Sequence, residues 1–380
     1  MENGGVRVPV SKLATGKVSS SKIVDETGRV LVNAGVMLTT QLQDSLLRRG
    51  IENVVVQIKA GAAKKGSAAD EASRDIYSPM CKRRQDWTSQ PYDEQVVERV
   101  ESAMDEIHGL LANIMDPSRD PEVSVDELLS VPEPLIDFAL EDQDVSIAST
   151  SRDTCSNEFQ SRTMTRTVLS IATAIEMGHI MDDVIDVGRA ALLHDYGLSF
   201  YPARFRDPLA QLDADDEWEY RKHPAKTSTL LRSMIRVPSR VRAVIMQIHE
   251  RLDGTGYPLG LKGVRISPLA RIIGVCGTYV DLIHAATNRP PFAPHQAILL
   301  LRHWAGEGIY DEEVVAAFVR NLSLYPIGSR VILDNGSQAQ VIRRAGDEIR
   351  KPTVKLISGM KDSDTILPLH ELGLEITSLA

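Results

Sequence analysis

The feature that most constrains the fold is a long run of segments in which apolar residues recur at the spacing of an α-helix. Such segments follow one another through the middle of the chain, at residues 168–177, 183–197, 226–235, 239–250, 270–286, 295–304 and 311–322. Each would carry an apolar stripe on one face of a helix, and helices of this kind bury their stripes against one another. The sequence therefore predicts a mainly α fold with an all-α bundle at its centre.

The pattern changes on both sides of the bundle. Near the N-terminus, β-rich runs around a Glu-Thr-Gly turn precede one helical pattern that Thr39 or Thr40 would cap, which predicts a small α+β module. Near the C-terminus, alternating runs flank Asn335-Gly336, a dipeptide typical of hairpin turns. We expect a small β unit to close the chain.

The segments between these parts are predicted to be connections. Residues 60–75 are small and polar, as in a linker, and residues 94–115 have helical periodicity. Residues 117–133 carry several prolines and acids, which predict a break. The expected domains are the α+β module at 1–75, a linker with a connecting helix at 76–150, the helical domain at 151–325 and the β unit at 326–380.

The charge of the chain limits its partners. The formal net charge is −9 and the pI is near 5.6, whereas a general binder of nucleic-acid polymers needs a dominant basic surface. A small anionic ligand held by a few local arginines is compatible with this charge. The sequence thus argues against a nucleic-acid polymer as the partner.

No segment predicts secretion or membrane insertion. The N-terminus lacks a basic start followed by an apolar run, and the most apolar later windows are interrupted by Asp195, Arg271 and Asp281. The three cysteines lie far apart and match neither a zinc spacing nor a disulfide framework. We expect a cytoplasmic protein.

Three polar motifs lie at the ends of predicted helices. His194-Asp195 ends an apolar helix, His223 begins the next, and His249 opens the stretch HERLDGTGYP. Imidazole nitrogens and carboxylate oxygens can converge on one cation, so His194, Asp195, His223 and His249 are candidate metal ligands. For the His-Asp pair alone, a buried hydrogen bond remains the alternative.

This series of motifs resembles the HD-GYP family, a branch of the HD superfamily of metal-dependent phosphohydrolases. The likeness covers roughly residues 155–325 and includes the stretch after the GYP loop and Asn288-Arg289-Pro290. The N-terminal module and the closing β unit are similar to pieces that often accompany such domains. The resemblance implies an HD-GYP helical bundle around two or three metal ions, with cyclic di-GMP opened to pGpG by water that the metals activate.

Measured against the family pattern, this chain lacks several ligands. One histidine of the usual His-His pair is Ile248, and the first-helix histidine falls on Thr163 or a neighbour. The late aspartate is Gly277, and the lysine after the HD turn is Leu198. The resemblance then implies at most one divalent ion, iron, manganese or zinc, with a metal-free centre as the alternative, and Asp195 as the residue on which catalysis would depend.

The GYP loop is retained although the metal ligands beside it are reduced. We define the loop as residues 249–258, and its members singled out here are Arg251, Asp253, Gly254, Gly256, Tyr257 and Pro258. The glycines would permit unusual backbone angles, Arg251 and Asp253 would form a salt bridge, and Tyr257-Pro258 would offer a stiff apolar surface. The alternative is that the loop serves only to fold the bundle.

Arg289 matches an arginine that faces substrate phosphate in the family, and a guanidinium can hold a phosphate with two parallel hydrogen bonds. The favoured interpretation is a catalytically impaired protein of bacterial cyclic di-GMP signalling, more a binding protein than an enzyme. Its partners would be cyclic di-GMP and a diguanylate cyclase (GGDEF) or another signalling protein. The alternatives are an active phosphodiesterase with a reduced metal site and a structural helical scaffold.

Overall fold

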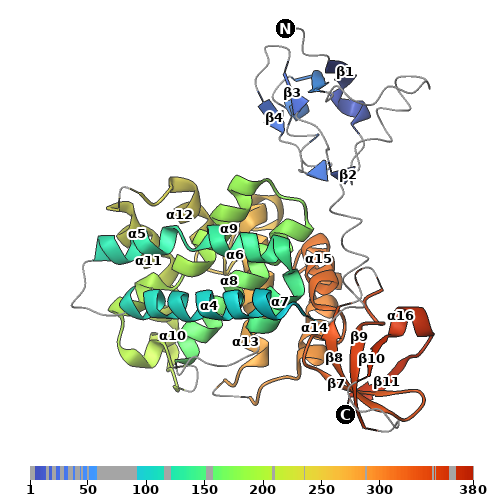
Figure 1. Cartoon of the computed structure of the whole chain (residues 1–380). Coiled ribbons are helices and arrows are strands. Elements are labelled where there is room, and N and C mark those ends of the chain that lie inside the picture. Colours follow the sequence, from blue (N-terminus) through green and yellow to red (C-terminus); the bar gives the residue numbers. More distant parts are fainter. Residues whose placement is uncertain are drawn as a thin grey trace. The chain divides into compact units, whose positions relative to one another are not determined.

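The chain is described by a computed structural model that covers most of the helical and C-terminal parts and pieces of the N-terminal part. The described residues are 5–13, 17–18, 23–25, 30–32, 37–38, 43, 46–48, 51–57, 92–114, 121–150, 157–207, 210–234, 236–286, 289–344, 346, 348–358 and 365–379. They fall into two units, Met1–Trp87 with Met177–Ile180, and Thr88–Glu176 with Met181–Ala380 (Figure 1). The expected linker at 60–75 and the capping Thr39 or Thr40 lie outside the described residues.

The first unit contains a small antiparallel sheet. Its strand order is β1 (Gly5–Pro9), β6 (Asn53–Gln57), β3 (Ile23–Val24) and β4 (Val30–Val32), and β2 (Lys17–Val18) pairs with β5 (Met37–Leu38). Apolar side chains that include Val10, Ile23 and Val54 form its core, and Leu46, in a helical piece, packs there too. The predicted small module with strands is therefore confirmed.

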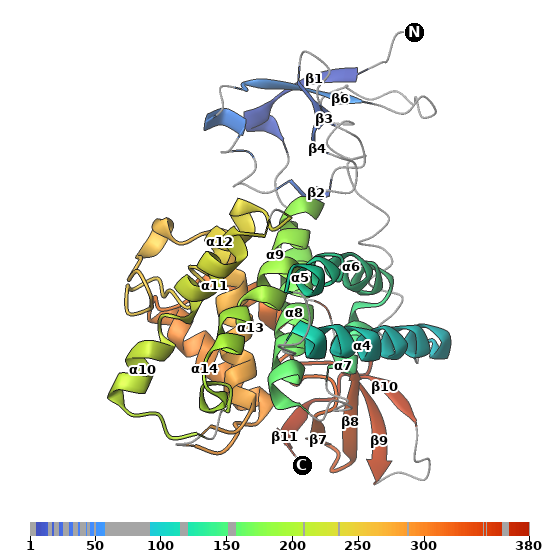
Figure 2. The same cartoon turned by 90° about the vertical axis from the view of Figure 1, so that its left-hand side faces the viewer.

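The second unit is built mainly of helices. In chain order they are α4 (Glu94–Ile114), α5 (Pro121–Leu129), α6 (Pro132–Glu141), α7 (Gln143–Ser149), α8 (Glu158–Glu176), α9 (Met181–Leu193), α10 (Ala214–Tyr220), α11 (His223–Arg232), α12 (Ser239–Ile245), α13 (Pro268–Ile283), α14 (Pro294–Gly306) and α15 (Glu312–Leu322). Helix α8 is buried from Thr163 to Ala174 and packs against α9, α13 and α15. Figure 2 shows α8 between α9 and the helices beside it. The predicted helical bundle is confirmed, with α8 at its centre.

The expected break at 117–133 is wrong over much of its length. Helix α5 begins at Pro121 and α6 begins at Pro132. Proline is well tolerated in the first turn of a helix, where its missing N–H would have no partner in any case. These prolines therefore start helices instead of interrupting the fold.

A five-stranded antiparallel sheet closes the second unit. Its strand order is β10 (Ile366–Pro368), β9 (Thr353–Ser358), β8 (Gln338–Arg343), β7 (Arg330–Leu333) and β11 (Ile376–Leu379). The predicted turn joins β7 to β8, with Gly336 at a φ of 80°. The short helix α16 (Leu369–Leu372) buries Leu369 against the sheet. The expected β unit is confirmed.

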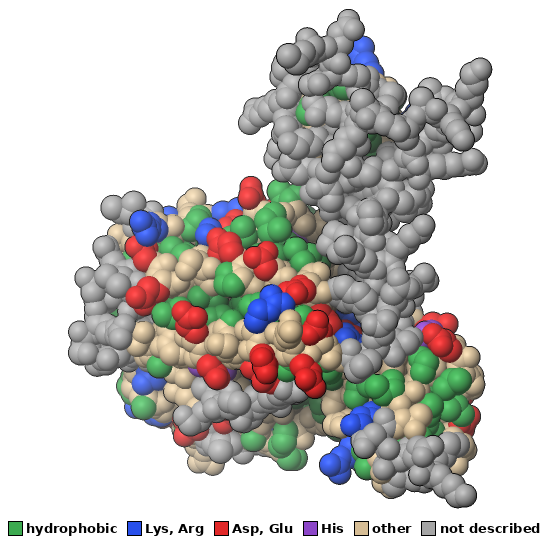
Figure 3. All heavy atoms as spheres, in the orientation of Figure 1, with side chains coloured by type: hydrophobic (Ala, Val, Ile, Leu, Met, Phe, Trp, Pro, Cys, Tyr) green, Lys and Arg blue, Asp and Glu red, His purple; other side chains and the backbone are tan. Residues whose placement is uncertain are grey.

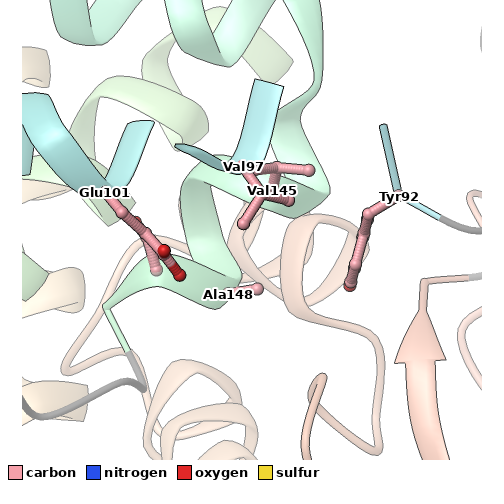
Figure 4. A pocket seen from close by; sticks show the side chains of 6 residues that line it. Tyr92, Val97, Glu101, Val145 and Ala148 are labelled. Carbon is pink, nitrogen blue, oxygen red and sulfur yellow. The ribbon is translucent and has the colours of Figure 1, made fainter. Parts of the chain in front are cut away.

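A buried ionic network joins this sheet to the helices. Arg343 is the last residue of β8, and its Nη1 lies 2.7 Å from Asp142 Oδ2. The Nε atom of the next residue, Arg344, lies 2.7 Å from Asp144 Oδ1. The Arg343 guanidinium also lies over the ring of Tyr92, which lines a small recess between α4 and α7 (Figure 4). Burial raises the pKa of Asp144, against the opposing charges of the two arginines. The β unit is thus held to the helices by paired charges.

The surface of the second unit agrees with the net charge of −9. Figure 3 shows Asp and Glu side chains spread over the face that carries α4, with few Lys and Arg side chains among them. Within the part of the chain that the structure describes, no helix is both long and apolar enough to cross a bilayer.

Replacing Arg343 tests the ionic network. Arg343→Met would leave Asp142 and Asp144 with one buried partner fewer, and removing one member of a buried pair typically costs about 3 kcal/mol of unfolding free energy. Urea denaturation of the full chain, followed by circular dichroism, measures this loss.

Arg99→Met is the matched control. Arg99 pairs with Glu141 at 2.6 Å, but both side chains are largely exposed, and pairs of this kind contribute little. The control should unfold at nearly the wild-type urea concentration. Equal losses in the two variants would contradict the role given to Arg343.

Candidate metal centre

The His194-Asp195 turn is fixed on the helix that carries His223. Thr227 Oγ1, on α11, donates to the carbonyl of His194 at 3.0 Å and accepts the N–H of Gly197 at 2.8 Å. A Cβ atom at Gly197 would lie only 2.6 Å from that hydroxyl, so a side chain there would push the turn away from α11. This close contact brings the ends of α9 and α11 together.

Two of the histidines have their Nδ1 atoms held by backbone carbonyls. His194 Nδ1 lies 2.7 Å from the carbonyl oxygen of Ala191, and His223 Nδ1 lies 2.7 Å from that of Tyr220. A carbonyl oxygen can only accept, so each Nδ1 carries the hydrogen and each Nε2 of the neutral ring has a free lone pair. This is the tautomer that a ligand through Nε2 requires.

Acceptor atoms of Asp195, His223 and His249 converge on one point. Their ligand atoms all lie within 4.8 Å of one another. His223 Nε2 is 3.1 Å from His249 Nε2 and 3.2 Å from Asp195 Oδ1, and that buried oxygen receives no hydrogen bond. Such a cluster is stable only with a proton or a cation among the lone pairs. The three residues therefore fit one divalent ion, since imidazole and carboxylate together suit zinc, manganese or iron.

The protonation states also suit a metal. Burial, followed by the charge of His223, lowers the pKa of His249 well below its ordinary value. Burial opposes ionisation of Asp195, but its contacts with His194 and His223 outweigh that effect and hold its pKa well below the usual range. A neutral imidazole and an ionised carboxylate are the forms that bind metals.

His194, the fourth predicted ligand, contacts an arginine and Asp195, whose Oδ2 lies 2.7 Å from its Nε2. Arg166, on α8, forms a hydrogen bond through Nη1 with His194 Nε2. The same nitrogen lies 3.5 Å from Asp195 Oδ2, and Arg166 Nη2 lies 3.3 Å from Asp281 Oδ1. The structure thus brings Asp195, His223 and His249 around one point, while His194 Nε2 lies between the Arg166 guanidinium and Asp195 Oδ2.

Sequence analysis missed Arg166. The only signal would have been one arginine among the small and apolar side chains of 163–174, a stretch that lies buried in α8. The carboxylate of Asp281, on α13, reaches Arg166 at the edge of the centre.

The GYP loop is held by an acid that the sequence did not single out. Glu250 is buried, and its two carboxylate oxygens accept the N–H groups of Leu259 at 2.7 Å and Leu261 at 2.8 Å. Gly254 has a φ of 88°, as expected for a glycine in a turn. Gly256 is required for another reason: a Cβ there would lie 2.4 Å from Glu250 Cα.

The expected salt bridge between Arg251 and Asp253 is wrong. Arg251 donates to the carbonyl of Glu250 at 2.9 Å and to Thr278 Oγ1 at 3.2 Å, which ties the loop to α13. Asp253 accepts the N–H and the hydroxyl of Thr255, two residues ahead. Aspartate commonly forms this local turn, and it leaves the carboxylate committed to its own loop.

The tyrosine of the loop lies against the centre. The Tyr257 ring stacks on the His249 ring, with centroids 4.7 Å apart and planes 6° apart, and the Tyr257-Pro258 peptide bond is cis. The exposed Arg221 also lies over the Tyr257 ring, with its guanidinium carbon 5.6 Å from the ring centroid. The loop therefore borders the candidate ligands directly.

The remaining positions singled out in the sequence lie in the apolar core or at the end of a helix. Leu198 and Ile248 are buried in the apolar core. Arg289 donates to backbone carbonyls at the end of α13, including those of Asp281 at 2.5 Å and Leu282 at 2.9 Å. Because a guanidinium is a suitable partner for the last carbonyls of a helix, Arg289 here caps α13.

Comparison with known proteins agrees with this architecture. The family model described as HD domain matches residues 143–314. The chain is 32% identical over 173 residues to "Cyclic di-GMP phosphodiesterase PA4108" of Pseudomonas aeruginosa, covering 46% of this chain and 41% of the relative. It is 28% identical over 181 residues to "Cyclic di-GMP phosphodiesterase PdeB" of Borreliella burgdorferi, covering 46% of each. The chain thus spans less than half the length of these curated relatives.

A solved structure shares the fold. "Bd1817, a HDG"Y"P protein from Bdellovibrio bacteriovorus" superposes with a TM-score of 0.50 at 16% identity, covering 83% of this chain and 98% of that one. Residues 143–314 thus match the family model of an HD domain, and the solved structure shows a similar fold.

Proposed function

We propose that this chain is a cyclic di-GMP-binding protein of bacterial signalling whose metal centre holds one divalent ion and is impaired in hydrolysis. The observation that carries the proposal is the convergence of Asp195, His223 and His249 on one point, while His194 is paired with Arg166. The nucleotide is suggested by the names of the relatives, which are cyclic di-GMP phosphodiesterases.

The impairment follows from the number of ligand atoms. A bound divalent ion would lower the pKa of the water molecule that it binds and would neutralise charge on the phosphoryl oxygens. In this chain Asp195, His223 and His249 would hold one such ion, and His194 Nε2 is already in contact with Arg166 Nη1 and Asp195 Oδ2. The position expected for a phosphate-facing lysine is the buried Leu198. One ion and few local cations favour binding over rapid turnover.

The GYP loop and Arg221 form the surface that we propose for nucleotide binding. Glu250 and Arg251 hold the GYP loop in place, and Tyr257 stacks on His249 at its inner side. Arg221 is exposed beside Tyr257 and offers a guanidinium to an anionic ligand. In this account Arg221 takes over the phosphate contact expected of Arg289, whose donors are used at the end of α13.

The bound state would then be read by another signalling protein, and a diguanylate cyclase (GGDEF) domain is the partner we propose. The compartment would be the cytoplasm. An active phosphodiesterase with a reduced site is the second candidate, because Asp195 and both convergent histidines are retained. The two candidates differ in turnover and not in binding.

Incubation with cyclic di-GMP and Mn²⁺ separates them. We expect binding by isothermal titration calorimetry. Turnover, followed as pGpG and GMP by chromatography, should be at least about 100-fold below that of an active relative, because the centre lacks a second metal ion to neutralise charge in the transition state. Arg221→Met should weaken binding without changing the fold. Turnover equal to the relative's and lost in Asp195→Asn would contradict the impairment.

Metal binding tests the three-ligand centre itself. His249→Ala should weaken Mn²⁺ binding by more than about tenfold, since even residues that only support ligands cost that much. His303→Ala is the matched control, because His303 is an exposed histidine of α14 beside Glu307. Calorimetric titration of metal-free protein measures both constants. Equal affinity in His249→Ala and wild type would rule out the proposed centre.

A further inference from the structure

Arg166 is a buried cation at the edge of the candidate metal centre. Its side chain is only 7% exposed, and its guanidinium lies between His194 and Asp195 on one side and Asp281 on the other. A guanidinium stays protonated in proteins, so this is a permanent positive charge. We propose that Arg166 is a built-in cation that takes the place of a second metal ion, and that it limits the centre to one divalent ion.

His194 is held at both nitrogens of its ring. Its Nδ1 is committed to the carbonyl oxygen of Ala191, so Nε2 is the only atom through which it could bind a metal. That Nε2 is in contact with Arg166 Nη1 and lies 2.7 Å from Asp195 Oδ2, so no open side remains for a metal ion. As long as Arg166 is in place, His194 is a partner of the guanidinium and not a metal ligand.

Gly277 leaves room for the Arg166 side chain. Gly277, on α13, faces the middle of the Arg166 side chain: a Cβ atom there would lie 2.8 Å from Nε and 3.3 Å from Cζ. Any side chain at 277 would therefore displace Arg166, including the carboxylate that the family pattern has at this position. Gly277 thus provides the space that Arg166 occupies. At this place the family pattern has a metal-binding acid, and this chain has the side chain of a cation.

The charge of Arg166 also affects the carboxylates around it. Arg166 neutralises one of the two carboxylates it contacts, Asp195 and Asp281. Asp195 Oδ1, on the side of His223, accepts no hydrogen bond from the residues that the structure describes. The arrangement leaves one negative charge for one ion at Asp195, His223 and His249. It also places a positive charge close to that ion, which weakens its binding.

This inference goes beyond the proposed function because it concerns cations alone and needs no nucleotide. The experiment uses the full chain, freed of metal by a chelator and titrated with Mn²⁺, with bound metal counted by elemental analysis after dialysis. Wild type should bind one ion per chain. Arg166→Met should bind its ion at least about tenfold more tightly, because a like charge has been removed beside it.

Two variants provide controls. Arg166→Lys keeps the charge and should keep the wild-type dissociation constant. Arg204→Met removes an exposed arginine that pairs with Asp216 at 2.8 Å, and should also leave the constant unchanged. Circular dichroism shows whether each variant is folded.

The outcomes separate this inference from the proposed function. Two ions bound by wild type would overturn the inference, whatever the variants do. A folded Arg166→Met that binds Mn²⁺ no more tightly than wild type would overturn it as well. If wild type binds none and Arg166→Met binds one, the internal cation is supported and the metal of the proposed function is rejected.

Discussion

The centre of this protein depends on the need for positive charge among converging lone pairs. Asp195 contributes a carboxylate, and His223 and His249 bring two Nε2 atoms within 3.1 Å of each other. Such atoms repel one another unless a cation or proton lies among them. The surrounding structure is arranged to force this approach: Thr227 locks the turn that carries Asp195 onto α11, and Tyr257 stacks on His249.

Positive charge reaches this cluster from two directions. Arg166 supplies it from within the protein on the side of His194, and a divalent ion would supply it on the side of His223. A guanidinium satisfies acids and accepting nitrogens as a metal does, but it cannot activate water. Replacing one ion by an arginine therefore preserves the packing and electrostatics of the site while reducing its chemistry. This explains how the GYP loop can remain well built beside a centre with few ligands.

Local patterns in the sequence were sufficient for the bundle, the small sheets, the Asn335-Gly336 turn and the positions of His194, Asp195, His223 and His249. Apolar spacing and motif order carry that information within one segment. Features that depend on pairs distant in sequence were missed. Arg166 meets His194 across 28 positions, and Arg343 meets Asp142 across 201.

Local reasoning also failed where side chains had a better partner elsewhere. Arg251 was expected to pair with Asp253 two positions away, but it reaches Thr278 on α13 instead. Gly256 was expected to need an unusual backbone angle, and it is close contact with Glu250 that requires it. In both cases the tertiary neighbour decides the role of the residue, and no single segment of sequence contains that neighbour.

Anomalous diffraction from crystals grown with Mn²⁺ tests the central claim most directly. The account predicts one anomalous peak per chain, bounded by Asp195, His223 and His249, with the Arg166 guanidinium still hydrogen-bonded to His194. Two peaks, with His194 ligating one of the ions and Arg166 turned away, would contradict it.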